Sequence, residues 1–417
     1  MTTTIIIAIC SLLLLAYIFD ITSNKTRIPS VILLLFLGWG VKQATVMLNV
    51  SLPDFSPLLP ILGTLGLILI VLDGSLELEL NKSKLGLIFK SFLGALLPIM
   101  ALSFALAYMF SYFGNVSLTV GLINAVPLCV ISSAIAIPSV RHLIPYHKEF
   151  VIYESSLSDI IGVLMFNFLA FNSSFDVNSF GEFGLQLLSM FIISLIAIAS
   201  LSYLLHRIKQ HIKFVPIILL VILIYTLAKV FHLPSLVFIL LFGLFLGNIC
   251  LLKRFKWTQR FQLQELEREV IKFKELTMEA TFLVRALFFL LFGYLIETTE
   301  VFNPQTILWA VGIVVATLFI RFLQLKMSRL PLKPLLFIAP RGLITVLLFL
   351  SIDPSQQIFF VNKSLIIQVI VISAFLMMFG LIAIKEYKVN PDETIEKKNE
   401  DISEEKLSSL LSEEKEE

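Results

Sequence analysis

The sequence predicts an all-α polytopic membrane protein, and three observations lead to that prediction. Hydrophobic residues make up 58% of the 417 residues, whereas charged residues make up only 15%. Soluble domains carry about 25% charged residues, so this composition is typical of a chain buried in lipid. The apolar residues also occur in long runs separated by short polar segments. Helices are expected in these runs because a helix satisfies its own backbone hydrogen bonds inside a bilayer.

Thirteen hydrophobic runs are candidates for membrane spans, since a bilayer core about 30 Å thick needs about 20 apolar residues per helix. The first run lacks the basic start and the small-residue cleavage site of a signal peptide, so we interpret it as an uncleaved span. The predicted spans are residues 4–20, 28–46, 57–73, 88–112, 117–140, 149–171, 184–205, 214–231, 234–252, 276–297, 303–325, 332–352 and 364–384.

The basic residues of the connections predict the orientation. Twenty lysines and arginines fall in alternate connections, beginning with the one after the first span, and the intervening connections hold only Lys42, Lys229 and Lys363. Cytoplasmic loops of membrane proteins carry the excess of basic residues. We therefore expect a multi-pass protein of the cell (inner) membrane, with its N-terminus outside and its C-terminus in the cytoplasm.

The rest of the composition excludes several classes of protein. Residues 1–384 are expected to form one membrane domain, with a cytoplasmic linker helix at about 253–275, and 385–417 a charged, disordered cytoplasmic tail. There is no catalytic motif and no glycine-rich phosphate loop, so neither an enzyme nor an ATP-driven pump is predicted. The three cysteines lie in apolar runs without metal-ligand spacing. We expect no cofactor, no bound metal beyond a transported ion, and no nucleic-acid partner.

Two carboxylates in the span 149–171 are the most informative residues. An acid within a bilayer-crossing helix costs several kcal/mol unless it is paired, hydrated or bound to a cation. Asp159 shares a helix face with Ser155, four residues earlier. Glu154 lies about 140° away around the helix, so the two acids should not share one proton. This pattern predicts a cation at Asp159 and Ser155, and a salt bridge from Glu154 to another helix.

The other charged residues of the spans have more ordinary interpretations. Asp20 is expected at the membrane interface, and Asp73 is either a span-end acid or part of the ion site. Arg321 lies near a cytoplasmic end, where it is expected to extend to water. Arg285 and Arg341 lie deeper in their spans and need partners.

Two spans carry signals of interrupted helices. Pro127 and Pro138 bracket a Ser-Ser-Ala segment at 132–134, and Ala-Pro-Arg-Gly occupies 339–342. Proline removes a helical hydrogen bond, and freed carbonyls inside a membrane must be satisfied by protein, water or an ion. Interrupted helices in two halves of a chain point to the binding site of a secondary transporter.

In combination and order, five motifs resemble those of a known family. The chain is similar over about residues 5–384 to the monovalent cation:proton antiporters, in particular the electroneutral sodium/proton exchanger branch. The segments that carry the resemblance are Glu-Ser-Ser-Leu-Ser-Asp (154–159), Ser-Ser-Ala-Ile-Ala-Ile (132–137), Pro-Arg-Gly-Leu (340–343), Leu-Asp-Gly-Ser-Leu-Glu-Leu (72–78) and 285–293.

The resemblance implies a fold and an assembly. The fold would contain about thirteen helices in inverted repeats with two interrupted, crossing helices. The protein would be a homodimer and would work by an elevator-like movement of its core.

The resemblance also implies the residues of the site. Asp159 would bind the cation or the proton, with Ser155 and the carbonyls near Ser132 completing the site and Asp73 nearby. Glu154 would pair with Arg341, and Arg285 is a possible second basic residue.

Two departures from the family pattern fall next to the predicted site. Ser158 stands where the family has Asn, and Ser132-Ser133-Ala134 stands where it has Thr-Asp-Pro. Ser132, Ser133 and Ser158 are therefore counted among the candidate cation- and proton-binding residues, and ion selectivity should be sought there.

The sequence thus favours a secondary antiporter that exchanges protons for a monovalent cation, Na⁺ first and K⁺ or Li⁺ next. If only a protonated or cation-bound Asp159 crosses the membrane barrier, and Glu154 stays ionised, exchange is electroneutral. Two alternatives remain open at this point. One is another inverted-repeat carrier or a channel, and the other is a non-transporting membrane sensor derived from the same fold.

Overall fold

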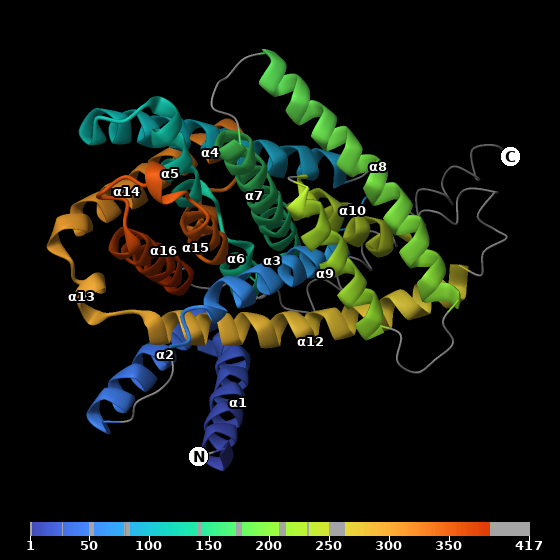
Figure 1. Cartoon of the computed structure of the whole chain (residues 1–417), viewed down its shortest axis with the longest axis horizontal. Coiled ribbons are helices and arrows are strands. Elements are labelled where there is room, and N and C mark those ends of the chain that lie inside the picture. The colour runs from blue at the N-terminus through green and yellow to red at the C-terminus, as the bar shows by residue number, and fades with distance from the viewer. Residues whose placement is uncertain are drawn as a thin grey trace, which may run out of the picture.

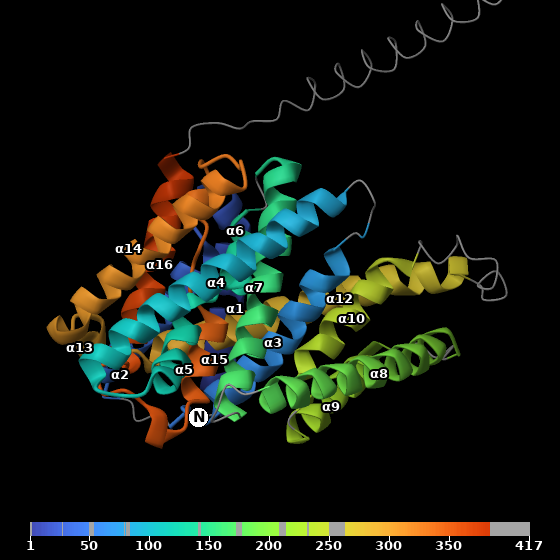
Figure 2. The same cartoon turned by 90° about the horizontal axis from the view of Figure 1, so that it is seen from above.

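The computed structural model of the chain is built of helices (Figures 1 and 2). It describes residues 2–26, 28–49, 54–78, 80, 84–140, 143–171, 177–207, 214–231, 233–249 and 263–383. The helices of these residues are α1 (Thr2–Thr26), α2 (Ser30–Met47), α3 (Leu58–Glu77), α4 (Leu85–Gly114), α5 (Leu118–Cys129), α6 (Ser133–Ser139), α7 (Pro145–Phe171), α8 (Val177–Arg207), α9 (Phe214–Val230), α10 (Ser235–Gly247), α12 (Leu263–Leu295), α13 (Thr298–Val301), α14 (Pro304–Met327), η3 (Leu335–Phe337), α15 (Leu343–Leu350), η4 (Pro354–Gln356) and α16 (Lys363–Ala383).

Eight helical segments of the described residues are long and apolar enough to cross a membrane. They are α2, α3, α4, α8, α14, α16, the pair α5–α6, and the apolar part of α12. The other five predicted spans coincide with α1, α7, α9, α10 and the pair η3–α15. The all-helical, multi-span fold class is therefore confirmed. The second half of the predicted linker, from Leu263, is continuous with the next span in α12, whereas 385–417 lies outside the described residues.

The helices form two groups. The site bundle, as we call it, consists of α4 to α7 and the segment from α14 to α16, which pack mainly on one another. The flanking panel consists of α1 to α3, α8 to α10 and α12. In Figure 1 the panel helices α8, α9 and α10 lie on one side of α7, and α14, α15 and α16 lie on the other. Among the helices of the panel, α3 is the main contact with the bundle.

Glycines allow the panel helices to approach closely. A Cβ atom on Gly38 of α2 would stand 2.1 Å from the Leu290 carbonyl oxygen of α12. A Cβ atom on Gly243 of α10 would stand 1.8 Å from the Ser75 hydroxyl oxygen of α3. Because lipid supplies no hydrophobic force between helices, close backbone packing at small residues holds such helices together. The panel is therefore a set of continuous, tightly packed helices.

Both predicted helix interruptions are present in the bundle. The first lies between α5 and α6, where Val130 and Ser132 are extended, with φ,ψ of −75°, 130° and −77°, 113°. The second lies between η3 and α15, over residues 338–342. The Ser132 N–H donates a hydrogen bond of 2.9 Å to the Pro340 carbonyl, so the two interruptions contact each other. The first interrupted element, α5–α6, lies between the long helices α4 and α7 in the chain. The second, η3–α15, lies between the long helices α14 and α16.

Candidate functional site

Asp159 lies where α7 passes the first interruption. Its side chain is buried, with 1% of its surface exposed, and its Oδ2 atom accepts hydrogen bonds from the hydroxyl and the N–H of Ser133. Its Oδ1 atom is buried and has no hydrogen-bond partner among the described residues. Buried polar atoms are normally hydrogen-bonded, so this oxygen can still accept a proton, a water molecule or a cation. The structure thus brings Ser133 to Asp159.

The remaining predicted serines occupy three different environments. The Ser132 hydroxyl oxygen is buried and, like Asp159 Oδ1, lacks a partner in the described part of the chain. The Ser158 hydroxyl oxygen accepts a 2.9 Å hydrogen bond from the Ile131 N–H, so it supports the interrupted backbone. The Ser155 hydroxyl donates to the Val151 carbonyl of its own helix at 2.7 Å. Of these three serines, Ser132 is the one whose hydroxyl oxygen, like Asp159 Oδ1, is buried and unpartnered.

A cavity of about 210 Å³ leads to this region from between panel and bundle. Ser133 lines it from α6, and Asp73 and Glu77 line it from α3. Lys148 also lines it, which places the cavity toward the side of the molecule that carries the basic connections. Asp73 therefore lies near the predicted site, as one of its two interpretations required, and faces a volume that accommodates hydrated ions.

Glu154 pairs with Arg321, so the predicted pair of Glu154 with Arg341 is wrong. The Arg321 guanidinium donates two hydrogen bonds to the Glu154 carboxylate, of 3.0 and 2.8 Å, and a third of 2.6 Å to the Leu335 carbonyl. The two side chains are 2% and 1% exposed, so Arg321 does not extend to water as expected. Gly94 of α4 makes room for the pair, because a Cβ atom there would stand 2.8 Å from Glu154 Oε1.

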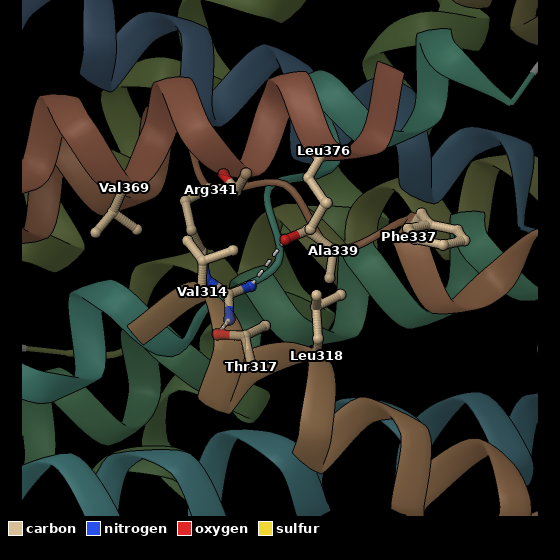
Figure 3. Close-up of a pocket in the computed structure, with 9 residues that line it drawn as sticks. Val314, Thr317, Leu318, Phe337, Ala339, Arg341, Val369 and Leu376 are labelled. Carbon is tan, nitrogen blue, oxygen red and sulfur yellow. Dashed lines mark hydrogen bonds between the residues drawn. The ribbon is translucent and has the colours of Figure 1, made fainter. Parts of the chain in front are cut away.

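Arg341 contacts both interruptions instead, and Figure 3 shows its contacts with Ala339 and Thr317. Its guanidinium donates to the carbonyls of Leu128 at 2.7 Å and Ala339 at 3.4 Å, and to the Thr317 hydroxyl at 3.2 Å. Leu128 lies at the end of α5 and Ala339 lies within the second interruption. The physical reason for the changed partner is that an arginine placed inside an interruption meets freed carbonyls first. A small cavity of about 10 Å³ beside it has room for about one water molecule.

Arg285, the possible second basic residue, lies in α12 of the panel. Its Nη2 atom is 3.4 Å from Asp20 Oδ1, and the Ser30 hydroxyl donates to the same oxygen at 3.1 Å. The Asp20 side chain is 17% exposed. Asp20 therefore belongs to an ion pair between α1 and α12, which its interpretation as an interfacial acid did not include.

The site can bind a small cation or a proton through oxygen atoms. It contains a buried carboxylate, buried hydroxyls and backbone at two interruptions. No group of three or more histidine, cysteine or acidic side chains among the described residues has the arrangement of a metal centre. Sequence reasoning missed Arg321 as the partner of Glu154, although its place in a long apolar run was a signal of burial.

The sequence pattern described as "Sodium/hydrogen exchanger, transmembrane" matches residues 10–384. The chain belongs to the sodium/hydrogen exchanger family. It is therefore a multi-pass membrane protein that performs cation/proton antiport and is not an enzyme. No curated protein matches the chain in sequence.

Solved structures are similar to the chain in fold. A structure of the sodium proton antiporter MjNhaP1 from Methanocaldococcus jannaschii at pH 8 aligns with a TM-score of 0.64 at 19% identity. The alignment covers 91% of this chain and 96% of that one. An electron-microscopy structure of the same antiporter aligns with a TM-score of 0.64 at 18% identity, covering 92% and 95%. At this level of identity the likeness establishes the antiporter fold of the chain.

Proposed function

We propose that this protein exchanges Na⁺ for protons, with Asp159 as the carboxylate that binds either ion. The observation that carries the proposal is the buried, unpartnered Oδ1 atom of Asp159, described above. A carboxylate inside a membrane is costly unless a proton or a cation neutralises it. The unpartnered Ser132 hydroxyl, next in sequence to the Ser133 that bonds Asp159, supplies a second oxygen for the cation.

Competition for one carboxylate couples the two ions. A bare Asp159 carries a charge that opposes movement through an apolar environment, whereas a protonated or Na⁺-bound Asp159 does not. If only the neutralised site moves between the two sides, each cycle carries a proton one way and a cation the other. The cavity that reaches Ser133 supplies the path from one side.

The Glu154–Arg321 pair supports electroneutral exchange. Two charge-assisted hydrogen bonds in a buried, bidentate geometry hold Glu154 ionised. Arg341 is occupied by carbonyls and by Thr317. With Asp159 as the carboxylate that changes its occupant, one proton exchanges for one cation.

The proposal extends to the membrane and the assembly. From the distribution of basic residues we propose that the protein lies in the cell membrane, with its N-terminus outside and its C-terminus in the cytoplasm. We expect a homodimer in which the site bundle moves relative to the panel. The tail 385–417 remains a predicted disordered segment.

Purified protein in liposomes that contain a pH-sensitive dye tests the proposal. An imposed Na⁺ gradient is expected to drive a change of internal pH, and parallel K⁺ and Li⁺ gradients define the selectivity. Asp159→Asn is expected to abolish the response, because the amide can neither ionise nor release a proton. Asp353→Asn, a change to an exposed acid of the connection before α16, is the matched control with unchanged exchange.

Two results would contradict the proposal. If none of the three cations drives a pH change in the wild type, the activity assigned to the protein is wrong. If Asp159→Asn retains Na⁺-driven exchange, the carboxylate that binds the ions lies elsewhere. A membrane potential that alters the wild-type rate would contradict electroneutrality alone.

A further inference from the structure

The buried ion pair of the panel faces the path of the transported cation. Arg285 of α12 contacts Asp20 of α1 at 3.4 Å and is itself only 7% exposed. Arg285 of the panel and Ser133 of the bundle both line the 210 Å³ cavity. Because Ser133 bonds Asp159 directly, the lining of this cavity combines a residue of the proposed ion site with a positive charge.

The charges around this cavity are nearly balanced. Its lining contains two acids and two bases, which are Asp73, Glu77, Lys148 and Arg285. Asp20 is not part of this lining, and its carboxylate offsets the charge of Arg285 through their 3.4 Å contact. With Asp20 the charges named here favour a cation by one negative charge, and without it they cancel. Charges act strongly on one another in a region of low dielectric constant.

We propose that Asp20 and Arg285 form an electrostatic control of cation affinity on the stationary side of the pathway. Arg285 opposes the cation that approaches Asp159, and Asp20 limits that opposition by holding and neutralising the guanidinium. Ser30 fixes the Asp20 carboxylate through its hydrogen bond, so the geometry of α1, α2 and α12 sets the balance. This inference rests on the proposed function, since it concerns the cation that Asp159 binds.

The two residues have opposite effects on the cation concentration that gives half-maximal exchange. Asp20→Asn leaves the charge of Arg285 without this counter-charge, so the half-maximal Na⁺ concentration is expected to rise, roughly threefold to tenfold. Arg285→Gln removes the repulsion, so the same quantity is expected to fall. In the double variant the value should follow Arg285→Gln, because Asp20 acts through Arg285. Arg285→Lys keeps the positive charge, so its half-maximal Na⁺ concentration should be closer to that of the wild type than to that of Arg285→Gln.

The experiment measures Na⁺-driven exchange in liposomes at a fixed pH over a range of Na⁺ concentrations. Maximal rate and half-maximal concentration are obtained separately for the wild type, both single variants and the double variant. Asp54→Asn, an exposed loop acid that bonds Ser56, is the matched control for the loss of one negative charge. The amount of folded protein is checked by thermal unfolding. If a single variant that lacks one member of the pair does not fold, the double variant is compared with the wild type instead.

Opposite shifts of the half-maximal Na⁺ concentration, with the double variant close to Arg285→Gln, support the inference. Unchanged half-maximal concentrations with reduced maximal rates would overturn it, since the pair would then only stabilise the packing of α1 on α12. If the effects of Asp20→Asn and Arg285→Gln on the half-maximal Na⁺ concentration are additive in the double variant, Asp20 does not act through Arg285 and that part of the inference is wrong. Failure of the proposed function is a different result, because wild-type exchange itself would then be absent or would survive Asp159→Asn.

Discussion

The site bundle and the flanking panel solve the problem of a membrane interior in different ways. In the panel, continuous helices satisfy their own backbone and approach one another at glycines such as Gly38 and Gly243. In the bundle, two helices are interrupted, and hydroxyls and arginines satisfy the exposed backbone, as Ser158 does for Ile131 and Arg341 does for Leu128. Several polar side chains of the bundle thus lie where regular backbone ends.

This difference assigns separate tasks to the two regions. The bundle holds a carboxylate with an unpartnered oxygen, which we propose as the position that binds the transported ions. The panel supplies a firm surface of helices and a charged wall of the cavity. Changes in the bundle should therefore affect ion binding and local order together, whereas changes at panel glycines should affect packing alone.

Loss of one partner of the Glu154–Arg321 pair is expected to give the largest effect. Arg321→Gln leaves the Glu154 carboxylate buried without its counter-charge, which costs about 3–5 kcal/mol. The midpoint of thermal unfolding in detergent should fall strongly and folded protein should be scarce. Arg341→Gln is the control that distinguishes the roles of the two arginines, because it leaves the Glu154–Arg321 pair intact. If Arg341→Gln is the more damaging change, the assignment of the ion pair to Arg321 is wrong.

Crowding of the panel should have the next largest effect. Gly243→Val places side-chain atoms against Ser75, because a Cβ atom added at this position would stand 1.8 Å from the Ser75 hydroxyl oxygen. Overpacking of this kind costs about 2–3 kcal/mol. Thermal unfolding measures the loss. Gly40→Val is the control from the same region, because nothing lies within 4 Å of a Cβ atom there. Equal losses in both variants would show that the close contact of α3 with α10 is not what stabilises the panel.

Removal of the hydroxyl that supports the first interruption should give a smaller loss. Ser158→Ala leaves the buried Ile131 N–H without its acceptor, at a cost of about 1–2 kcal/mol. Ser194→Ala is the matched change in the panel, where the buried hydroxyl only bonds the Met190 carbonyl of its own helix. We expect the first variant to unfold at a lower temperature than the second. The reverse order would contradict the view that hydroxyls of the bundle replace regular backbone hydrogen bonds.

Local sequence patterns predicted much of the fold. They could not predict which arginine pairs with Glu154. Apolar runs determine where helices lie, and Pro127 and Pro340 mark the two interruptions because proline cannot continue a helical ladder. Asp159 is identified as the candidate ion-binding acid because a carboxylate in an apolar membrane helix is energetically costly. Which arginine reaches Glu154 depends on how α14 packs against α4, which in turn packs against α7, and that arrangement has no signature in a single sequence.

The sequence also contained a clue to the role of Arg341 that the expectation overlooked. An arginine between proline and glycine in an interruption is surrounded by carbonyls that have lost their helical donors. Its guanidinium therefore donates to these nearby carbonyls and not to a more distant carboxylate. The partners of Asp20 could not be predicted for a related reason. Its position near a span end predicts exposure, but the approach of Arg285 and Ser30 from other helices is a tertiary contact.

The most direct test of the account is the pH dependence of the half-maximal Na⁺ concentration of wild-type exchange in liposomes. Because a proton and Na⁺ compete for Asp159, this concentration should rise about tenfold for each unit by which the pH is lowered through the acid range, while the maximal rate at saturating Na⁺ stays constant. A half-maximal concentration that is independent of pH, with a maximal rate that changes, would mean that the two ions bind separate groups and would contradict a single shared carboxylate.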